Sequence, residues 1–376
     1  MRKPVLMITI GTRPEAIKMA PVVLALRAEP RIETVLCSTG QHREMLAQAL
    51  QIFGLKPDID LAVMQTAQTL TAATTAVLNG LDQVFLTKRP DRLIVHGDTL
   101  TTFSASLSAF YHHIPVAHVE AGLRTGRMDA PWPEEGNRRL TSVLTNLHFA
   151  PTEQAKENLL REGVLADQIH VTGNTVIDAL LAVSRKLDTD SALESSVQGS
   201  YGKLDDTKKL VLVTGHRREN FGEGFRNLCL ALKTLAQRSD VEIVYPVHLN
   251  PSVRDVVSRE LADTPNIRLI SPLDYLPFVS LMKKASVILT DSGGIQEEAP
   301  SLGKPVLVMR EVTERPEAVR MGCVRLVGTD ARKIVGEVSR LLDDPEAASQ
   351  MSRAQNPYGD GFAATRIKDV LTKSLL

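Results

Sequence analysis

The stretch Ser286-Val287-Ile288-Leu289-Thr290-Asp291-Ser292-Gly293-Gly294-Ile295-Gln296-Glu297-Glu298-Ala299 decides the fold of this chain. A short apolar strand runs into Ser-Gly-Gly, where a helix is expected to begin at once. Glycines let the backbone approach a ligand closely, and the N-terminal end of a helix favours an anion such as a phosphate. One turn later, Glu297 and Glu298 offer a carboxylate for two ribose hydroxyls. The stretch predicts a nucleotide diphosphate site, with a plain strand-to-helix connection as the alternative.

Short apolar runs alternate with helical patterns along the rest of the chain. The expected strands lie at 5–10, 34–38, 92–96, 115–119, 147–150, 210–214, 241–247, 267–270, 286–290, 305–309 and 324–327. Helices are expected between them. One is 100–112, in which Leu100, Phe103, Leu107 and Phe110 share a face. This alternation predicts an α/β fold of parallel sheets covered by helices on both faces.

With 376 residues, the chain exceeds the usual size of one domain. The two halves also repeat one topology, so we expect two Rossmann-like, doubly wound domains that face a central cleft. Ligands should bind at the carboxyl ends of the strands. The N-terminal domain is predicted over 1–172, with a final helix over 358–376 packing back on it, and the C-terminal domain over 173–357. Residues 184–209 have no apolar face and read as a surface connection.

Composition excludes several classes of protein. Lys plus Arg (44) equals Asp plus Glu (44), so no global field directs the chain to nucleic acid or to an anionic membrane. The three cysteines have no paired spacing, which argues against disulfides and a zinc site. The apolar run in residues 1–10 is too short for a signal peptide, and no run reaches the ~18 apolar residues of a membrane span. We expect a cytoplasmic protein without a metal.

Charged residues follow several expected strands of the first half. Arg13 and Lys18 come after the first strand, where solvated surface charge is the alternative. Asp98 and Glu120 follow two further strands, and Asp98 is also a candidate helix N-cap. Glu134, with the adjacent glutamate, either stabilises the start of the next helix or joins these acids. Crowded carboxylates are expected to raise at least one pKa towards the range of acid–base catalysis.

The second half supplies the complementary charges. His216 follows the first expected strand of that half, directly after a glycine, and a purely structural histidine is the alternative. Arg315 lies beyond another strand end and is suited to bind a phosphate through two N–H groups.

Taken together, these motifs resemble those of the non-hydrolysing UDP-N-acetylglucosamine 2-epimerases, whose fold is of the two-domain glycosyltransferase B type. The resemblance runs from Gly11-Thr12-Arg13-Pro14-Glu15 to Asn356-Pro357-Tyr358-Gly359-Asp360. Between these ends it includes His96-Gly97-Asp98-Thr99, Glu120-Ala121-Gly122-Leu123-Arg124, Pro133-Glu134-Glu135-Gly136-Asn137-Arg138, Gly215-His216-Arg217-Arg218-Glu219-Asn220, Asp291-Ser292-Gly293-Gly294 and Glu314-Arg315-Pro316-Glu317.

The resemblance implies reversible interconversion of UDP-GlcNAc and UDP-ManNAc, which supplies ManNAc-type sugars for surface polysaccharides. UDP would leave C1 as the C2 proton is removed, giving 2-acetamidoglucal, and would then add back as a proton returns to the other face of C2. No nicotinamide or metal is needed. By the resemblance, the acid–base candidates are Asp98, Glu120 and Glu134, and His216 would contact the diphosphate or assist departure of UDP. The nucleotide sugar would be held by Arg13, Lys18, Ser292, Gly293, Gly294 and Arg315, the ribose by Glu298, and the uracil by Leu273 and Phe278.

The resemblance also implies a homodimer and a possible second pocket for UDP-GlcNAc as an activator. Gln41 and His42 match one wall of that pocket, whereas Thr66-Ala67-Gln68 departs from the usual Pro-Gly-Gln at a nearby loop. Three alternatives remain open: a hydrolysing relative that releases ManNAc and UDP, a glycosyltransferase on the same scaffold, and a nucleotide-sugar sensor without catalysis.

Overall fold

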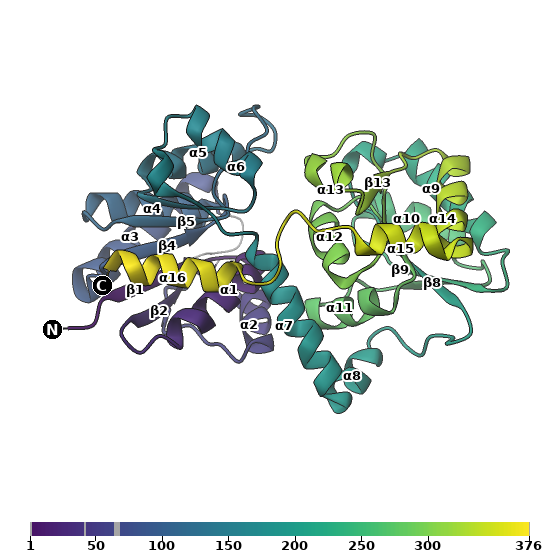
Figure 1. Cartoon of the computed structure of the whole chain (residues 1–376), viewed down its shortest axis with the longest axis horizontal. Helices are drawn as coiled ribbons and strands as arrows, with labels where there is room; N and C mark the ends of the chain where they lie inside the picture. The colour runs from purple at the N-terminus through teal and green to yellow at the C-terminus, as the bar shows by residue number, and fades with distance from the viewer. Residues whose placement is uncertain (1, 41–42, 64–67, 376) are drawn as a thin grey trace. The chain divides into compact units, whose positions relative to one another are not determined.

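The computed structural model describes residues 2–40, 43–63 and 68–375 of the chain. They form two compact units: unit 1 is Met1–Ala179 with Tyr358–Leu376, and unit 2 is Leu180–Pro357. Each unit consists of one parallel sheet with helices on both faces (Figure 1). In the described ranges, no helix combines the length and the apolar character needed to cross a membrane.

Unit 1 is built on a parallel sheet that shows, in its described part, the order β3-β2-β1-β4-β5-β6-β7. Its strands are β1 (Val5–Ile10), β2 (Glu33–Ser38), β3 (Ile59–Asp60), β4 (Arg92–His96), β5 (Val116–Val119), β6 (Leu147–Ala150) and β7 (Ile169–Val171). Every residue of the central strand β1 is buried. A continuous apolar strand of this kind is stable because helices cover both faces of the sheet.

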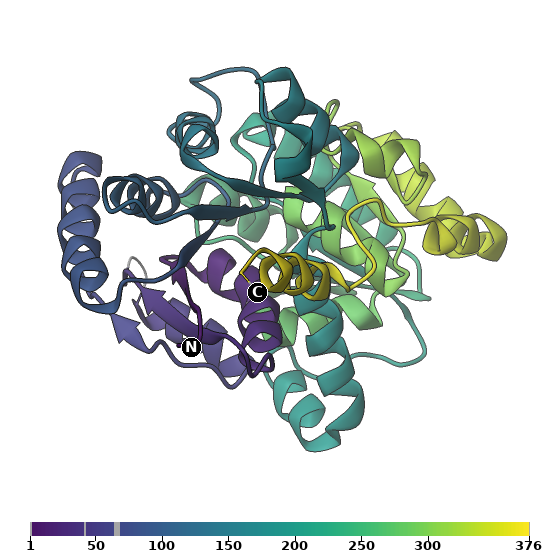
Figure 2. The ribbon, with the colours of Figure 1, turned by 60° about the vertical axis from the view of Figure 1, so that its left-hand side comes forward.

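The helices of unit 1 lie in two layers. They are α1 (Arg13–Arg27), α2 (Arg43–Ile52), α3 (Leu70–Lys88), α4 (Leu100–Tyr111), α5 (Glu134–Leu144), α6 (Glu153–Arg161) and α16 (Ala363–Leu375), with a short 3-10 helix at Ala166–Gln168. On one face, α16 at the C-terminus lies beside α1, as the yellow and purple helices in Figure 2 show. On the other face, α4 packs between α3 and α5.

Unit 2 is built on a parallel sheet with the order β10-β9-β8-β11-β12-β13. Its strands are β8 (Lys209–Thr214), β9 (Val241–Pro246), β10 (Ile267–Ile270), β11 (Val287–Thr290), β12 (Val306–Val308) and β13 (Val324–Leu326). Its helices are α8 (Ser191–Gln198), α9 (Glu223–Leu235), α10 (Pro251–Leu261), α11 (Tyr275–Lys284), α12 (Gly293–Glu298), α13 (Pro316–Arg320), α14 (Ala331–Asp343) and α15 (Pro345–Arg353), with 3-10 helices at Arg218–Asn220 and Ala299–Leu302. The helix α7 (Thr175–Thr189) contains the division between the units.

The expected α/β fold is confirmed, and each of the expected strands occurs within one residue of its predicted ends. The short edge strands β3 and β7 were not expected. The prediction of a surface connection over 184–209 was wrong in its first part, because α7 and α8 continue through residue 198.

The apolar stripe of α4 is not the most buried face of the helix. Leu100, Phe103 and Leu107 are only half-buried, and Phe110 is 57% exposed. The residues of α4 that are fully buried are small or polar: Thr101, Thr102, Ser104, Ala105, Ser106, Ser108 and Ala109. The apolar period predicted the helix correctly but does not mark the face that packs on the sheet.

Candidate active site

Several of the predicted site residues follow the central strands at their carboxyl ends. In unit 1 the strand order reverses between the neighbours β1 and β4, and in unit 2 between β8 and β11. Arg13 follows β1 and Asp98 follows β4, while His216 follows β8 and Ser292 follows β11. Open α/β sheets bind their ligands at such reversals.

Asp98 lies in the loop between β4 and α4, where its carboxylate forms an ion pair with Arg138 of α5. The alternative role as a helix cap is wrong, because Thr99 is the N-cap of α4. Burial raises the pKa of Asp98 above its ordinary value, Arg138 opposes this shift, and Glu120 adds to it. The pKa therefore moves in the expected direction, with burial rather than crowding of charges as the largest cause.

Glu120 directly follows β5 and has a left-handed backbone, with φ of 61°, a conformation that is uncommon for a residue other than glycine. Its Oε2 accepts hydrogen bonds from Lys18 Nζ at 2.5 Å and from Asn174 Nδ2 at 3.0 Å. His96 Nε2 lies 3.8 Å from the same oxygen, and burial lowers the pKa of His96 to about 4, so that it is neutral at pH 7. Lys18 is therefore paired with a predicted site carboxylate and is not a solvated surface charge.

The glutamates at the start of α5 differ in environment. Glu134 begins the helix and is half-buried, in the first turn where a negative charge suits the helix dipole. Glu135 is completely buried: it accepts the Thr125 backbone N–H at 3.1 Å and lies 3.4 Å from Arg138 Nη1. Glu135 therefore supports the arginine that holds Asp98. Sequence reasoning quoted Arg138 only within a motif, and its position one helical turn after Glu134 is the signal that could have identified it.

His216 is positioned by Asp291, which the sequence predictions did not include. The fully buried Asp291 carboxylate accepts the backbone N–H groups of His216 and Arg217, each at 2.9 Å. Its Oδ1 lies 3.5 Å from His216 Nδ1, and the His216 ring stacks on His248 with centroids 5.4 Å apart. Burial lowers the pKa of His216, while the charge of Asp291 acts in the opposite direction. The position of an aspartate directly after β11 was the available signal.

Two guanidinium groups lie beside Gly293, at the start of α12. A Cβ placed on Gly293 would lie 3.6 Å from Arg315 Cζ and 3.7 Å from Arg217 Nη2. Arg315 is oriented by Glu297, whose Oε1 accepts from Arg315 Nε at 2.6 Å. The two guanidinium groups thus lie beside the glycine backbone that follows Ser292, the N-cap of α12. This arrangement suits an anion such as a diphosphate, and Arg217 is an addition to the predicted residues.

The predicted ribose carboxylate lies one turn later in the same helix. Tyr275 of α11 donates its hydroxyl to Glu298 Oε2 at 3.2 Å, and burial raises the pKa of Tyr275 well above its ordinary value, so the hydroxyl keeps its proton. Glu298 Oε1 lies 3.7 Å from where a Cβ of Gly294 would be. Of the two glutamates of this stretch, Glu297 is used by Arg315, and Glu298 is the candidate for a ribose.

The remaining predicted residues are those for the uracil and those for the activator site. Leu273 precedes α11 and Phe278 lies within it, and both are half-buried. At the predicted activator site, Gln68 donates its side-chain amide to the Val63 carbonyl at 3.4 Å. Gln41 and His42 lie outside the described residues.

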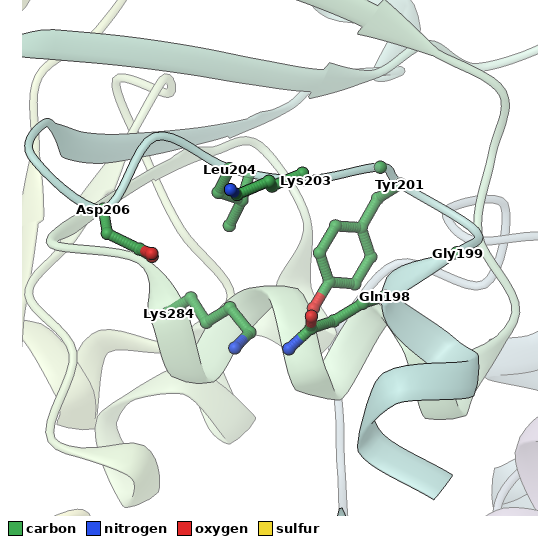
Figure 3. Close-up of a pocket in the computed structure, with 8 residues that line it drawn as sticks. Gln198, Gly199, Tyr201, Lys203, Leu204, Asp206 and Lys284 are labelled. Carbon is green, nitrogen blue, oxygen red and sulfur yellow. The ribbon is translucent and has the colours of Figure 1, made fainter. Parts of the chain in front are cut away.

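A cavity of about 440 Å³ lies elsewhere in unit 2 (Figure 3). It is lined by the segment 198–206 and by Lys284 at the end of α11, and the Tyr201 hydroxyl beside it lies 2.7 Å from Ser280 Oγ. In the described part of the chain, its lining contains none of the predicted site residues. The strand ends, and not this cavity, therefore define the candidate site.

Comparison with known proteins identifies the family of the chain. The family model described as UDP-N-acetylglucosamine 2-epimerase matches residues 24–372. The chain belongs to the UDP-N-acetylglucosamine 2-epimerase family. It is 58% identical to the UDP-N-acetylglucosamine 2-epimerase of Escherichia coli O157:H7 over 362 residues, which cover 96% of each chain.

Solved structures of family members are also similar. The crystal structure of UDP-GlcNAc 2-epimerase from Neisseria meningitidis bound to UDP-GlcNAc has 50% identity and a TM-score of 0.88, covering 98% of this chain and 100% of the other. The Methanocaldococcus jannaschii UDP-GlcNAc 2-epimerase in complex with UDP-GlcNAc and UDP has 34% identity and a TM-score of 0.78, covering 98% and 99%. The two-domain fold expected from the sequence is the fold of this family.

Proposed function

We propose that this protein is a non-hydrolysing UDP-N-acetylglucosamine 2-epimerase that interconverts UDP-GlcNAc and UDP-ManNAc. The observation that carries the proposal is the pair of acids on adjacent strand ends of unit 1. Asp98 is paired with Arg138 and Glu120 with Lys18, so that the two carboxylates have separate cationic partners and different surroundings. Groups with distinct environments can hold different protonation states, as acid–base catalysis on two faces of one carbon requires.

The reaction needs no redox step. The C2–H bond is not acidified by a carbonyl group, so the proton leaves C2 as the C1–O bond breaks and its electron pair departs with UDP. A C1=C2 double bond forms, giving 2-acetamidoglucal. UDP then adds back at C1 while a proton is delivered to the opposite face of C2. Asp98, Glu120 and Glu134 are the proposed proton carriers, with a role still to be assigned to each.

Unit 2 is proposed to bind UDP. Arg315, the backbone over Ser292–Gly294 and the neighbouring Arg217 are proposed to bind the diphosphate. Arg13 is proposed as a further residue that binds the nucleotide sugar. His216 is proposed to assist departure of UDP, because it directly precedes Arg217, whose guanidinium lies beside Gly293. Glu298 is proposed to bind the ribose, and Leu273 and Phe278 to flank the uracil. Tight retention of UDP keeps the glycal from escaping.

The deciding experiment is incubation with UDP-GlcNAc alone in deuterium oxide, followed by proton NMR. We expect UDP-ManNAc to appear, with deuterium at C2 of both sugars. Retention of the original hydrogen at C2 would refute the proton chemistry. Steady release of free ManNAc would instead establish the hydrolysing alternative, and turnover only with an added acceptor would establish a glycosyltransferase.

We also propose a homodimer formed through the outer face of α3, α4 and α5. Large apolar side chains are exposed on these three neighbouring helices, namely Leu86 (52%), Phe110 (57%), Tyr111 (67%), Leu140 (50%) and Val143 (84%). Exposed apolar side chains concentrated on one face are typical of association surfaces. Light scattering should give the mass of a dimer for the wild type and of a monomer for Phe110→Glu. Leu165→Glu, at another exposed apolar residue (62%), is the control that should stay dimeric.

Activation by a second UDP-GlcNAc remains a prediction, and so do the cytoplasmic location and the supply of surface polysaccharides. For activation, conversion of UDP-ManNAc should show a lag that added UDP-GlcNAc shortens. Gln68→Ala should lengthen that lag.

A further inference from the structure

Glu15, in the first turn of α1, is a buried carboxylate with an unusual set of partners. Glu15 is only 2% exposed. Oε2 accepts the backbone N–H groups of Gly11 at 2.9 Å and of Thr12 at 2.7 Å, and the Thr12 hydroxyl at 2.8 Å. The bond from the Thr12 N–H, together with the Glu15 backbone N–H donated to Thr12 Oγ1 at 3.5 Å, forms the capping box of α1. These contacts fix the loop between β1 and α1.

The second carboxylate oxygen contacts a different loop. Oε1 accepts the hydroxyl of Thr99 at 2.7 Å, and Thr99 is the N-cap of α4. One side chain therefore joins the N-termini of two helices that follow the adjacent strands β1 and β4. Arg13 directly follows the cap of α1, and Asp98 directly precedes the cap of α4. Both predicted site residues are thus one residue away from a contact of Glu15.

The surrounding loops leave little room for an alternative arrangement. A Cβ on Gly11 would lie 2.2 Å from Thr101 Oγ1 and 2.6 Å from Thr39 Oγ1. These two hydroxyls form a hydrogen bond with each other at 2.9 Å. The loops that follow β1 and β2 therefore meet the first turn of α4 at one close-packed point, and a shift in one of these segments displaces the others.

We propose that Glu15 is a positioning residue for the epimerisation: by spanning the two caps, it fixes the backbone of Arg13 relative to that of Asp98. This inference rests on the proposed function, since it assigns both residues to one reaction. Glu15 acts through its length and its two oxygens, and does not itself contact the substrate. Small misplacements of catalytic groups lower the rate strongly, by up to about a hundredfold for 1 Å.

Two substitutions distinguish the effect of the length of the Glu15 side chain from the effect of its charge. Glu15→Gln keeps the length: its amide oxygen can accept the two backbone N–H groups while its NH2 donates to Thr99. Glu15→Asp keeps the charge but is one methylene too short to span both loops. We expect the Gln variant to retain kcat within about fivefold and the Asp variant to lose about tenfold or more. KM for UDP-GlcNAc should stay within about threefold in both, because the link governs reaction geometry.

The other end of the link is tested at Thr99, where Thr99→Val removes the hydroxyl and Thr99→Ser keeps it. The matched control is Thr152→Val, which removes an equivalent N-cap from α6; the caps of α4 and α6 each accept a backbone N–H at 3.2 Å. Both Val variants should lose thermal stability. Only Thr99→Val should also lose kcat, by about tenfold or more, and Thr99→Ser should retain it.

The outcomes are distinct. Equal kcat in Thr99→Val and Thr152→Val, at equal folded fractions, would overturn the positioning role, as would a fully active Glu15→Asp with an inactive Glu15→Gln. Should Glu15→Asp fail to fold, the Thr99 and Thr152 comparison decides alone. A wild type that interconverts no nucleotide sugar removes the proposed function itself, whereas an active wild type with unaffected variants removes only this inference.

Discussion

Replacing Arg138 with methionine should shift the pH dependence of the enzyme in a calculable way. The side chains of Arg138 and Asp98 are 12% and 28% exposed, so their ion pair is partly shielded from water. A nearby cation lowers a carboxyl pKa by about 1–3 units. Loss of Arg138 should therefore raise the pKa of Asp98 by about 1–3 units, in the direction in which burial already moves it. At about 1.4 kcal/mol for each unit, the ionised form loses about 1.4–4 kcal/mol.

The assay is the pH profile of kcat/KM for conversion of UDP-GlcNAc, which reports the ionisations of the free enzyme. If ionised Asp98 removes the proton, its active form is populated only above its pKa. The acidic limb of the profile should then move to higher pH by the same 1–3 units. Glu135 also loses a cation 3.4 Å away. The folded fraction must therefore be verified by thermal unfolding first.

Arg139→Met is the matched control for this experiment. Arg139 is the next residue of α5, its side chain is 44% exposed, and its Nε lies 3.5 Å from Glu162 and not beside Asp98. Its loss should leave the profile unchanged. If the profiles of Arg138→Met and wild type superimpose, or if both arginine variants shift alike, the ion pair does not control the ionisation that limits the reaction.

Three further predictions concern other parts of the structure. Gly122→Ala should lower the free energy of unfolding, measured with urea, by about 3–5 kcal/mol, because the φ of Gly122 is 89° and the new Cβ would lie 2.2 Å from a carbonyl oxygen. Gly163→Ala is the control, since Gly163 has a φ of 88° but no atom among the described residues lies within 4 Å of its Cβ position. It should lower the free energy of unfolding by only about 1–2 kcal/mol. Asp291→Asn should lower the pKa of His216, since the aspartate charge raises it. An NMR titration of the histidine measures this pKa, and an unchanged pKa would contradict the prediction. Wild type should bind UDP more tightly than 2′-deoxy-UDP, and Glu298→Gln should reduce this preference in calorimetry; a preserved preference would place the ribose elsewhere.

Much of the fold was predictable because its signals are local. Buried parallel strands are continuous apolar runs, and β1 and β11 stand out for this reason. The edge strand β3 (Ile59–Asp60) has only two residues. The strand β7 (Ile169–Val171) lies between the polar Gln168 and Thr172, whereas apolar neighbours extend the equally short β12 and β13. The outward face of α4 could not be predicted either, because hydrophobic periodicity identifies a helix without indicating what covers its apolar side.

The candidate site was predictable where residues follow strands, as for Asp98, Glu120 and His216. What could not be read from the sequence is which charges pair. Arg138 reaches Asp98 from 40 residues away, and Asp291 contacts the His216 loop from 75 residues away. Both contacts form because neighbouring strands of the folded sheet bring the partners together. The separation of the partners along the sequence does not indicate that they are in contact.

The outward apolar stripe of α4 has a practical consequence if a second copy covers it. Association then adds to the unfolding free energy of unit 1 by mass action, by about 2.7 kcal/mol when the partner is at a hundred times the dissociation constant. The melting temperature should rise with enzyme concentration. Stock solutions diluted for kinetic work would lose specific activity over time, even though every catalytic side chain is intact.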